Sequence, residues 1–189
     1  RIIEHACSLV PSVVLITNGS HVTEDTAARL GAAGLSSVQL TLLAGDRDLH
    51  DRLKGAVCFD ETTRAALRLS DAGVNVQVCY VAMRENIGQL RPVMELCAAL
   101  GVRGLSYNRM APTGRAIHHV ARLMPTAADL EADLDIAEAL GRQWNISVGT
   151  AMPVPPCLVR VERYRWIRFG FCSTGSYSPN IVIDPAGEV

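Results

Sequence analysis

The sequence has no CxxC pair, no excess of one charge and no long apolar run, and each absence excludes a class of protein. Its six cysteines include no pair at CxxC spacing, so no complete local metal site can be identified. Lysine and arginine number 18 against 19 aspartates and glutamates, which gives no electrostatic attraction for nucleic acid or an anionic membrane. No apolar run approaches the roughly 18 residues that a membrane span requires. We therefore expect no nucleic-acid partner and no membrane partner.

The cysteines and the first residues indicate the setting of the chain. Cys58, Cys79 and Cys97 lie in apolar stretches, which predicts small buried thiols. A disulfide framework does not suit a chain of 189 residues with 49% hydrophobic content, and we expect a cytoplasmic protein. The opening RIIEHACSLV is typical of the middle of an amphipathic helix and begins at Arg1 rather than Met. We expect an internal piece of a longer protein.

One pattern repeats along the chain, a short apolar run followed by a stretch with helical spacing. The strand-like runs are PSVVLI, SSVQLTL, NVQVCYVA, RGLSYN and NISVG. The helices between them have predicted N-terminal caps, of which the last two show capping-box spacing: Thr23, Asp60, Asn86 with Gln89, and Thr126 with Asp129. The stretch between the second strand and Asp60 is interpreted as a long loop.

This alternation predicts an α/β fold with a parallel sheet and outer helices. About four or five strands are too few to close a (β/α)8 barrel, so we expect an open, partial (β/α) barrel over residues 1–150. Ligands of such sheets bind at the carboxyl ends of the strands. Polar, glycine-rich segments stand there, namely TNG, TLLAG, AMREN and NRMAPTGR, although each taken singly fits ordinary turn chemistry equally well.

Taken in order, these segments resemble those of radical S-adenosylmethionine (radical SAM) enzymes. TNGSHVTEDTAARL is similar to the stretch after the third barrel strand of that family. VQLTLLAGDRDLHDRLKG, followed by FDETTRAALRLSDAGVNVQV, resembles its fourth unit, and VAMRENIGQL and MAPTGRA resemble its fifth and sixth strand ends. The family's CxxxCxxC loop and GGEP-type segment are absent from the sequence, and the resemblance places both before Arg1.

The last part of the chain resembles the start of a SPASM domain, an extension that binds auxiliary iron–sulfur clusters. Cys172 is followed by 14 residues and then Gly187, and the matching second cysteine would lie beyond Val189. Cys157 stands where this branch often has an earlier ligand. The resemblance therefore implies a linker and a truncated SPASM-like β-hairpin segment over residues 151–189. Cys157 and Cys172 would be metal ligands in the longer protein, but not in this fragment.

The resemblance also implies residues that bind S-adenosylmethionine (SAM). Asn18 ends a strand where its amide can contact the nucleoside or the carboxylate, with turn capping as the alternative. Thr41 keeps a hydroxyl where the family usually has serine. Lys54 stands at a usually basic position, where a cation can pair with the methionine carboxylate, and Arg109 can act similarly.

Three other patterns receive structural interpretations. His50 and Asp51 are expected to fix the long loop locally, and His118–His119 to lie in an exposed loop. VRVERYRWIRFG alternates basic and aromatic residues but is interpreted as an irregular segment over the barrel mouth, not as a nucleic-acid strip.

The activity implied by the resemblance is that of a radical SAM/SPASM iron–sulfur oxidoreductase. In that class a [4Fe–4S] cluster cleaves SAM to a 5′-deoxyadenosyl radical, which abstracts hydrogen from a substrate, here a peptide or a small metabolite. Both cofactors are expected in the intact protein and neither in this fragment, which should be inactive alone. The alternative is a non-catalytic half-barrel module, whose exposed sheet edges would take a partner chain or form a homodimer.

Overall fold

A computed structural model describes residues 1–155, 157–171 and 181–188 of the chain. All of its strand pairs are parallel, and the sheet order follows the sequence from β1 to β6. The strands are β1 (Val14–Thr17), β2 (Ser37–Thr41), β3 (Val76–Ala82), β4 (Gly104–Arg109), β5 (Ser147–Thr150) and β6 (Arg168–Phe169). The predicted α/β fold is confirmed, and β6 is one strand more than expected.

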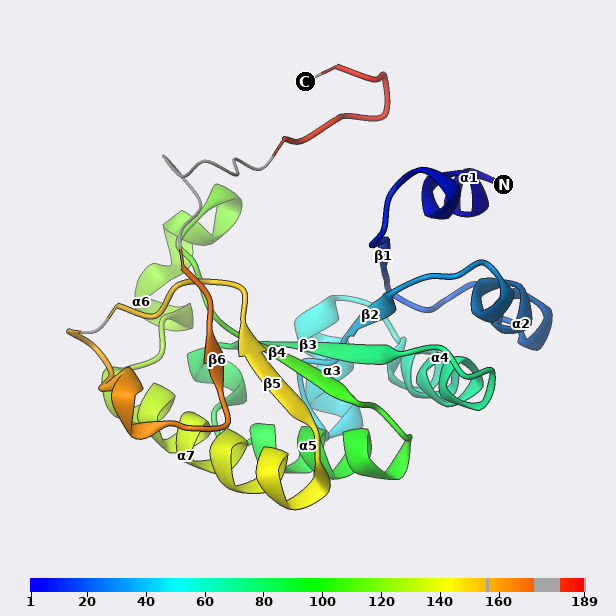
Figure 1. Cartoon of the computed structure of the whole chain (residues 1–189). Helices are drawn as coiled ribbons and strands as arrows, with labels where there is room; N and C mark the ends of the chain where they lie inside the picture. Colours follow the sequence, from blue (N-terminus) through cyan, green and yellow to red (C-terminus); the bar gives the residue numbers. More distant parts are fainter. Residues whose placement is uncertain (156, 172–180, 189) are drawn as a thin grey trace.

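The helices connect successive strands and follow the outer side of the curved sheet (Figure 1). The α-helices are α1 (Ile2–Leu9), α2 (Glu24–Ala32), α3 (Arg47–Lys54), α4 (Phe59–Asp71), α5 (Leu90–Ala99), α6 (Val120–Leu123) and α7 (Ala127–Trp144). Short 3-10 helices are η1 (Arg84–Asn86), η2 (Gly114–His119) and η3 (Val161–Arg163). In the part of the chain that the structure describes, no helix is long and apolar enough to cross a membrane.

Alternation along the strands separates a covered face of the sheet from an open one. In β3 every second residue is buried beneath the helices, from Val76 to Ala82, and the residues between them are half-buried. β4 continues the pattern with buried Leu105 and Tyr107. Because successive side chains point to opposite faces of a strand, the half-buried set lies on the open face, which the described helices do not cover.

Most predicted helix signals are confirmed. The Thr23 hydroxyl accepts from the Thr26 N–H at the start of α2. Thr126 and Asp129 form a capping box at the start of α7. The predicted apolar faces of α5 and α7 are buried, apart from half-buried Leu100, which follows α5 as its C-cap residue: Leu90, Val93, Met94, Cys97, Leu130, Leu134, Ala137 and Leu140.

Three predictions between β2 and α5 are wrong. The expected long loop contains helix α3, which the Asp46 side chain caps at its start and left-handed Gly55 ends. Helix α4 begins after Cys58, so Asp60 lies in its first turn instead of capping it. Asn86 belongs to η1, and α5 has no side-chain cap. The buried Asn86 side chain bonds backbone groups of Leu43, Val81 and Met83 instead, so it does not cap α5.

The segment after β5 extends the sheet, contrary to the expectation of an irregular cover over the barrel mouth. Glu138 on α7 accepts hydrogen bonds from the backbone N–H groups of Arg165, Trp166 and Ile167. These bonds hold the segment against α7 and lead it into β6. The hydrophobic core therefore runs through Ile167, beyond the predicted barrel boundary at residue 150.

The end of the chain shows the turn of the expected hairpin but not its first strand. The Asp184 N–H donates to the Glu188 carbonyl, and the Gly187 N–H donates to the Asp184 carbonyl. Residues 181–183 are exposed and have no strand assignment, so the predicted strand NIVI is not found over the described positions.

Candidate functional site

The open face of the sheet carries a row of small polar side chains across three strands. Thr41 ends β2 and is the direct neighbour of Cys79 in β3, which in turn pairs with Ser106 in β4. All three are half-buried. The row starts at the carboxyl end of β2, where ligands of parallel sheets bind, and crosses the middle of β3 and β4.

Asn108 joins this row to the loop after β5. Its Nδ2 donates to the Ser106 hydroxyl at 3.1 Å and contacts the Cys79 sulfur at 3.4 Å. Its Oδ1 accepts the N–H groups of Ala151 and Met152, each at 3.0 Å. One amide therefore fixes both the strand-end side chains and the loop that borders them.

Three side chains hold the loop that follows Thr41. The Nδ2 of buried Asn86 donates to the Leu43 carbonyl at 2.7 Å. The Gln89 Oε1 accepts the N–H groups of Gly45 and Asp46, and the His50 Nδ1 accepts the Leu43 N–H at 3.2 Å. Asn86 and Gln89 thus hold the main chain beside Thr41 from a distant part of the sequence. His50 holds it from within the same segment, which confirms the local role predicted for His50.

Lys54 lies within electrostatic reach of this face. Burial raises the pKa of the Cys79 thiol, and the Asn108 amide and the Lys54 cation act in the opposite direction. Burial also lowers the pKa of His50, with the Lys54 charge as the second cause. A half-buried cation at the end of α3 can therefore attract an anionic group to the Thr41 side of the sheet.

The other two residues predicted to bind SAM have local partners. The exposed Asn18 uses its Oδ1 to accept from the N–H and hydroxyl of Ser20, which is the turn role considered as the alternative. The Arg109 side chain donates to the carbonyls of Pro153 and Met110. Arg109 therefore helps hold the segment after β5.

The cysteines in the described ranges do not assemble into a set of iron–sulfur ligands. Cys7, Cys58, Cys79, Cys97 and Cys157 are free thiols there. Cys157 is exposed, and Cys172 lies outside the described residues. A [4Fe–4S] cluster needs cysteine thiolates gathered around it, so this part of the chain does not fit the cluster. Cys97 is buried as predicted, whereas Cys58 and Cys79 are only half-buried.

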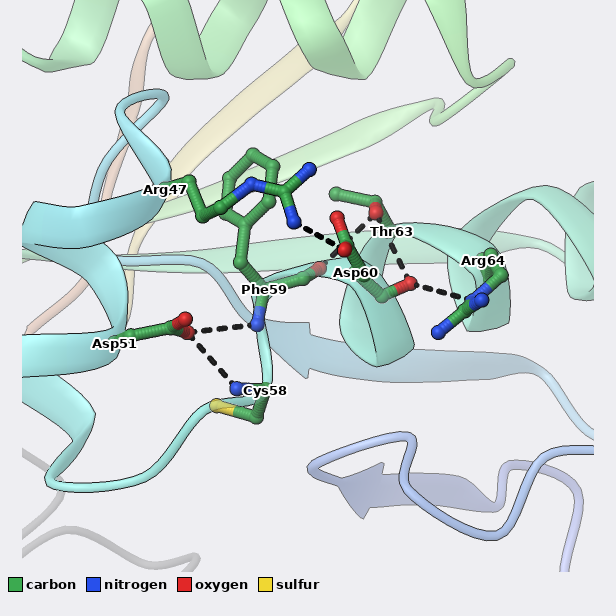
Figure 2. Close-up of polar contacts among 7 residues, drawn as sticks. All are labelled: Arg47, Asp51, Cys58, Phe59, Asp60, Thr63 and Arg64. Atoms are coloured by element: carbon green, nitrogen blue, oxygen red, sulfur yellow. Dashed lines mark hydrogen bonds and ion pairs between the residues drawn. The ribbon is translucent and has the colours of Figure 1, made fainter.

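His50, Asp51 and Cys58 come together between α3 and α4, with their ligand atoms within 4.8 Å of one another. Figure 2 shows Asp51 accepting the backbone N–H groups of Cys58 and Phe59, each at 2.8 Å. These bonds cap α4 and hold the pKa of Asp51 below its usual value. An ion pair between Arg47 and Asp60 joins the same two helices.

The ring of His50 makes this group a structural link, not a metal site. Because its Nδ1 accepts the Leu43 N–H, the neutral ring carries its proton on Nε2, which faces the Cys58 sulfur at 3.6 Å. A metal would need the lone pair of that same Nε2, and the displaced proton would then oppose the Leu43 N–H.

A cavity of about 490 Å³ adjoins the polar row on the open face. It covers β3 to β6 and includes Ser106, whereas Thr41 lies outside its lining. Gln77, Gly149 and Arg168 belong to its walls. The site thus has two neighbouring parts, the row from Thr41 to Ser106 and the cavity beside it.

Sequence reasoning missed Cys79 and Ser106 and placed Asn108 only within the strand-end segment NRMAPTGR, without a role of its own. The available signal was the two-residue period of a β-strand. It places the Cys79 side chain on the other face of the sheet from Val78 and Tyr80. In β4 it places Ser106 and Asn108 on the other face from Leu105 and Tyr107. An apolar stretch was taken as buried on both faces, although only one face is covered.

Comparison with known proteins gives consistent matches. The Radical SAM superfamily model matches residues 1–97. The chain is 32% identical over 128 residues to the mycofactocin maturase MftC of Mycolicibacterium smegmatis, covering 67% of this chain and 32% of that protein. It is 29% identical over 189 residues to the PqqA peptide cyclase of Streptomyces rochei, covering 100% of this chain and 50% of that protein.

Solved structures show the same fold. Streptococcus suis SuiB bound to S-adenosylmethionine superposes with a TM-score of 0.59 at 16% identity, covering 73% of this chain and 32% of SuiB. SuiB bound to the precursor peptide SuiA gives 0.58 at 14% identity, covering 84% of this chain and 32% of SuiB. The chain thus spans from 32% to 50% of the length of these proteins.

Proposed function

The chain belongs to the radical SAM superfamily, and we propose that it supplies SAM-binding strand ends to a SPASM-type enzyme that modifies a peptide. The observation that carries this proposal is the row of Thr41, Cys79 and Ser106, with Lys54 in electrostatic reach. The family uses a [4Fe–4S] cluster and SAM. When bound, they supply the radical that abstracts a substrate hydrogen.

In this proposal each side chain has a binding or positioning task. The Thr41 hydroxyl hydrogen-bonds the nucleoside, and the Lys54 cation pairs with the methionine carboxylate. Asn18 contacts the same ligand from the end of β1. Arg109 and Asn108 hold the segment after β5 that borders the site. Cluster ligands come from outside the described residues, with Cys157 and Cys172 as SPASM ligands.

Two features support the substrate and the compartment. The relatives include a peptide cyclase and a structure with a bound precursor peptide, which favours a peptide over a small metabolite. All five cysteines of the described part are free thiols, as expected in a reducing compartment, and we place the protein in the cytoplasm.

The proposal is tested with Thr41→Val in the intact protein, reconstituted anaerobically with iron and sulfide. The variant is expected to bind SAM about tenfold more weakly, because one hydrogen bond is lost at nearly constant volume. Its release of 5′-deoxyadenosine at limiting SAM should fall in parallel. Thr63→Val, at a threonine whose hydroxyl serves the α4 backbone, is the matched control.

Equal SAM affinity in the Thr41 and Thr63 variants would refute the assigned role of Thr41. The 189-residue chain alone, reconstituted in the same way, is expected to show no [4Fe–4S] absorbance. A stoichiometric cluster in it would show that the ligands lie within the chain after all.

The free edge of the sheet supports self-association as a further part of the proposal. β1 is the first strand in the sheet order, and its Val14 and Ile16 are 51% and 69% exposed. Edge strands with apolar side chains pair with other chains, so we expect a homodimer of the isolated chain. Ile16→Lys should give a monomer by light scattering, and a wild-type chain already monomeric at high concentration would contradict this.

A further inference from the structure

The cavity on the open face is lined by cationic and neutral side chains only. Arg103 and Arg168 are the charged members of its lining, which contains no aspartate or glutamate. The neutral polar members are Asn75, Gln77, Ser106, Ser147 and Thr150. A neighbouring hollow of about 330 Å³ shares Ser147 and Arg168 and adds Arg165, again without an acidic residue.

Arg103, Arg165 and Arg168 are exposed and differ from three other arginines in the described ranges, although Arg103 also borders a hollow that Asp71 lines. Arg47, Arg122 and Arg163 form ion pairs with nearby carboxylates. Among the described residues, none forms a hydrogen bond or an ion pair with the side chain of Arg103, Arg165 or Arg168. Guanidinium groups are suited to planar carboxylates, which accept two parallel N–H bonds.

Gly149 keeps the cavity open. It pairs with both Ser106 and Arg168 and so lies on the open face, whereas the space over Gly104 on the same face is filled by the Gln77 side chain. A Cβ added at Gly149 would have the Arg168 carbonyl at 3.6 Å as its one neighbour within 4 Å, which is ordinary contact. Packing therefore does not require glycine there. Glycine within a strand often marks the close approach of a ligand.

The cavity also borders the end of the sheet. β6 is the last strand in the sheet order, and its Arg168 and Phe169 both line the cavity. The outer edge of a terminal strand offers backbone N–H and C=O groups to an extended peptide. The polar row continues into this place, because Ser106 pairs with Gly149 and Gly149 with Arg168.

We propose that this cavity binds a carboxylate of the peptide substrate through Arg103 and Arg168, on the same open face of the sheet that carries the polar row. The inference rests on the proposed function for its peptide. The inference adds that the peptide substrate has an acidic residue in the part that lies against the sheet. Gln77 and Ser147 supply neutral hydrogen bonds to the bound group, and Gly149 leaves room for the peptide backbone.

The test measures fluorescence anisotropy of a labelled glycine peptide with one central glutamate, against the same peptide with glutamine. The full chain is expected to bind the glutamate peptide at least about tenfold more tightly. Arg168→Gln should remove that preference, and Arg168→Lys should retain part of it because the charge remains. Gly149→Val should abolish binding by filling the cavity, without loss of stability, because valine favours strands.

Arg91→Gln, on the exposed side of α5, is the matched control and should change nothing. Urea unfolding of each variant establishes that it is folded. Equal affinity for the two peptides, or unchanged binding in Arg168→Gln, would overturn the proposal. Displacement of the peptide by inorganic phosphate at far lower concentration than by acetate would assign the cavity to free phosphate instead and also overturn it.

Failure here is distinguishable from failure of the proposed function. Peptide binding to the chain needs neither cluster nor SAM. If the glutamate preference is absent while Thr41→Val still weakens SAM binding in the intact protein, the carboxylate inference alone fails. If Thr41→Val has no effect while the preference persists, the SAM assignment fails and the anionic cavity stands.

Discussion

Asp133→Asn is expected to stabilise the protein at pH 8 by roughly 2 to 4 kcal/mol and to have little effect at pH 4. Asp133 lies on α7 against the sheet with 2% of its surface exposed. Its hydrogen bond comes from the Tyr107 hydroxyl at 3.3 Å, and no cation pairs with it in the described ion pairs. Burial raises its pKa from 3.8 to about 7, and each unit corresponds to about 1.4 kcal/mol.

The sign follows from proton linkage. Between pH 4 and 7 the folded state holds a proton on Asp133 that the unfolded state has released, so stability falls as the pH rises through this window. The groups that face Asp133 do not compete there: burial raises the pKa of Tyr80 and of Tyr107 above their usual values, and the pKa of Asp129 lies below its usual value. Asparagine removes the charge, and with it this slope.

The measurement is the urea unfolding free energy of both proteins from pH 4 to 8. Asp129→Asn, on the same helix, is a control with the opposite sign. Its carboxylate caps α7 and has a lowered pKa through its bonds to Thr126, so its stabilisation is present at neutral pH and lost on acidification. If the unfolding free energies of wild type and Asp133→Asn change with pH in parallel, the pKa of Asp133 is not raised by folding and the prediction is wrong.

The repeated strand and helix pattern could be predicted because local and tertiary signals agree. In α7 the Thr126 cap, the acidic first turn and the apolar face around Leu134 all favour the same helix. In β3 the apolar run coincides with a buried face from Val76 to Ala82, which packs against α4. Secondary structure can be predicted from a sequence where local propensity and tertiary packing favour the same element in this way.

Helix α3 shows where such agreement is lacking. Its residues Arg47–Lys54 include one buried side chain, His50, so the sequence has no apolar stripe that would predict this helix. The Asp46 cap and the Gly55 terminus were present in the sequence, but a polar helix between them is hard to tell from a loop. It forms because His50 and Asp51 bond backbone groups of Leu43 and Cys58, which no local pattern encodes.

The site was predicted in part for the same reason. Thr41 and Lys54 could be proposed as SAM-binding residues because family resemblance marks single positions. Cys79 and Asn108 depend on which face of the sheet is covered, and that is decided by the path of the helices. The proposed preference of the cavity for anions depends on Arg103 and Arg168, which are 65 residues apart in the sequence. They line the same cavity only because β4, β5 and β6 pair.

Asn86→Ala is expected to destabilise the protein by about 3 to 5 kcal/mol, since three backbone groups lose their partner at once. The side chain is fully buried. It donates to the carbonyls of Leu43 and Val81 at 2.7 and 2.9 Å and accepts the Met83 N–H at 2.7 Å. An unsatisfied buried polar group costs about 1 to 3 kcal/mol, and a cavity adds to this.

Asn86→Asp separates hydrogen bonding from volume. The carboxylate is the same size but would face two carbonyl oxygens without a donor, so it should destabilise about as much as alanine. Gln89→Ala, which frees only the N–H groups of Gly45 and Asp46, should cost about 1 kcal/mol. Urea unfolding ranks the three variants, and amide exchange at Met83 reports the lost bond directly. A mild Asn86→Asp would mean that Asn86 only fills space. The expected ranking instead means that Asn86 holds the loop beside Thr41, so that stability and the geometry of the proposed SAM site depend on one buried amide.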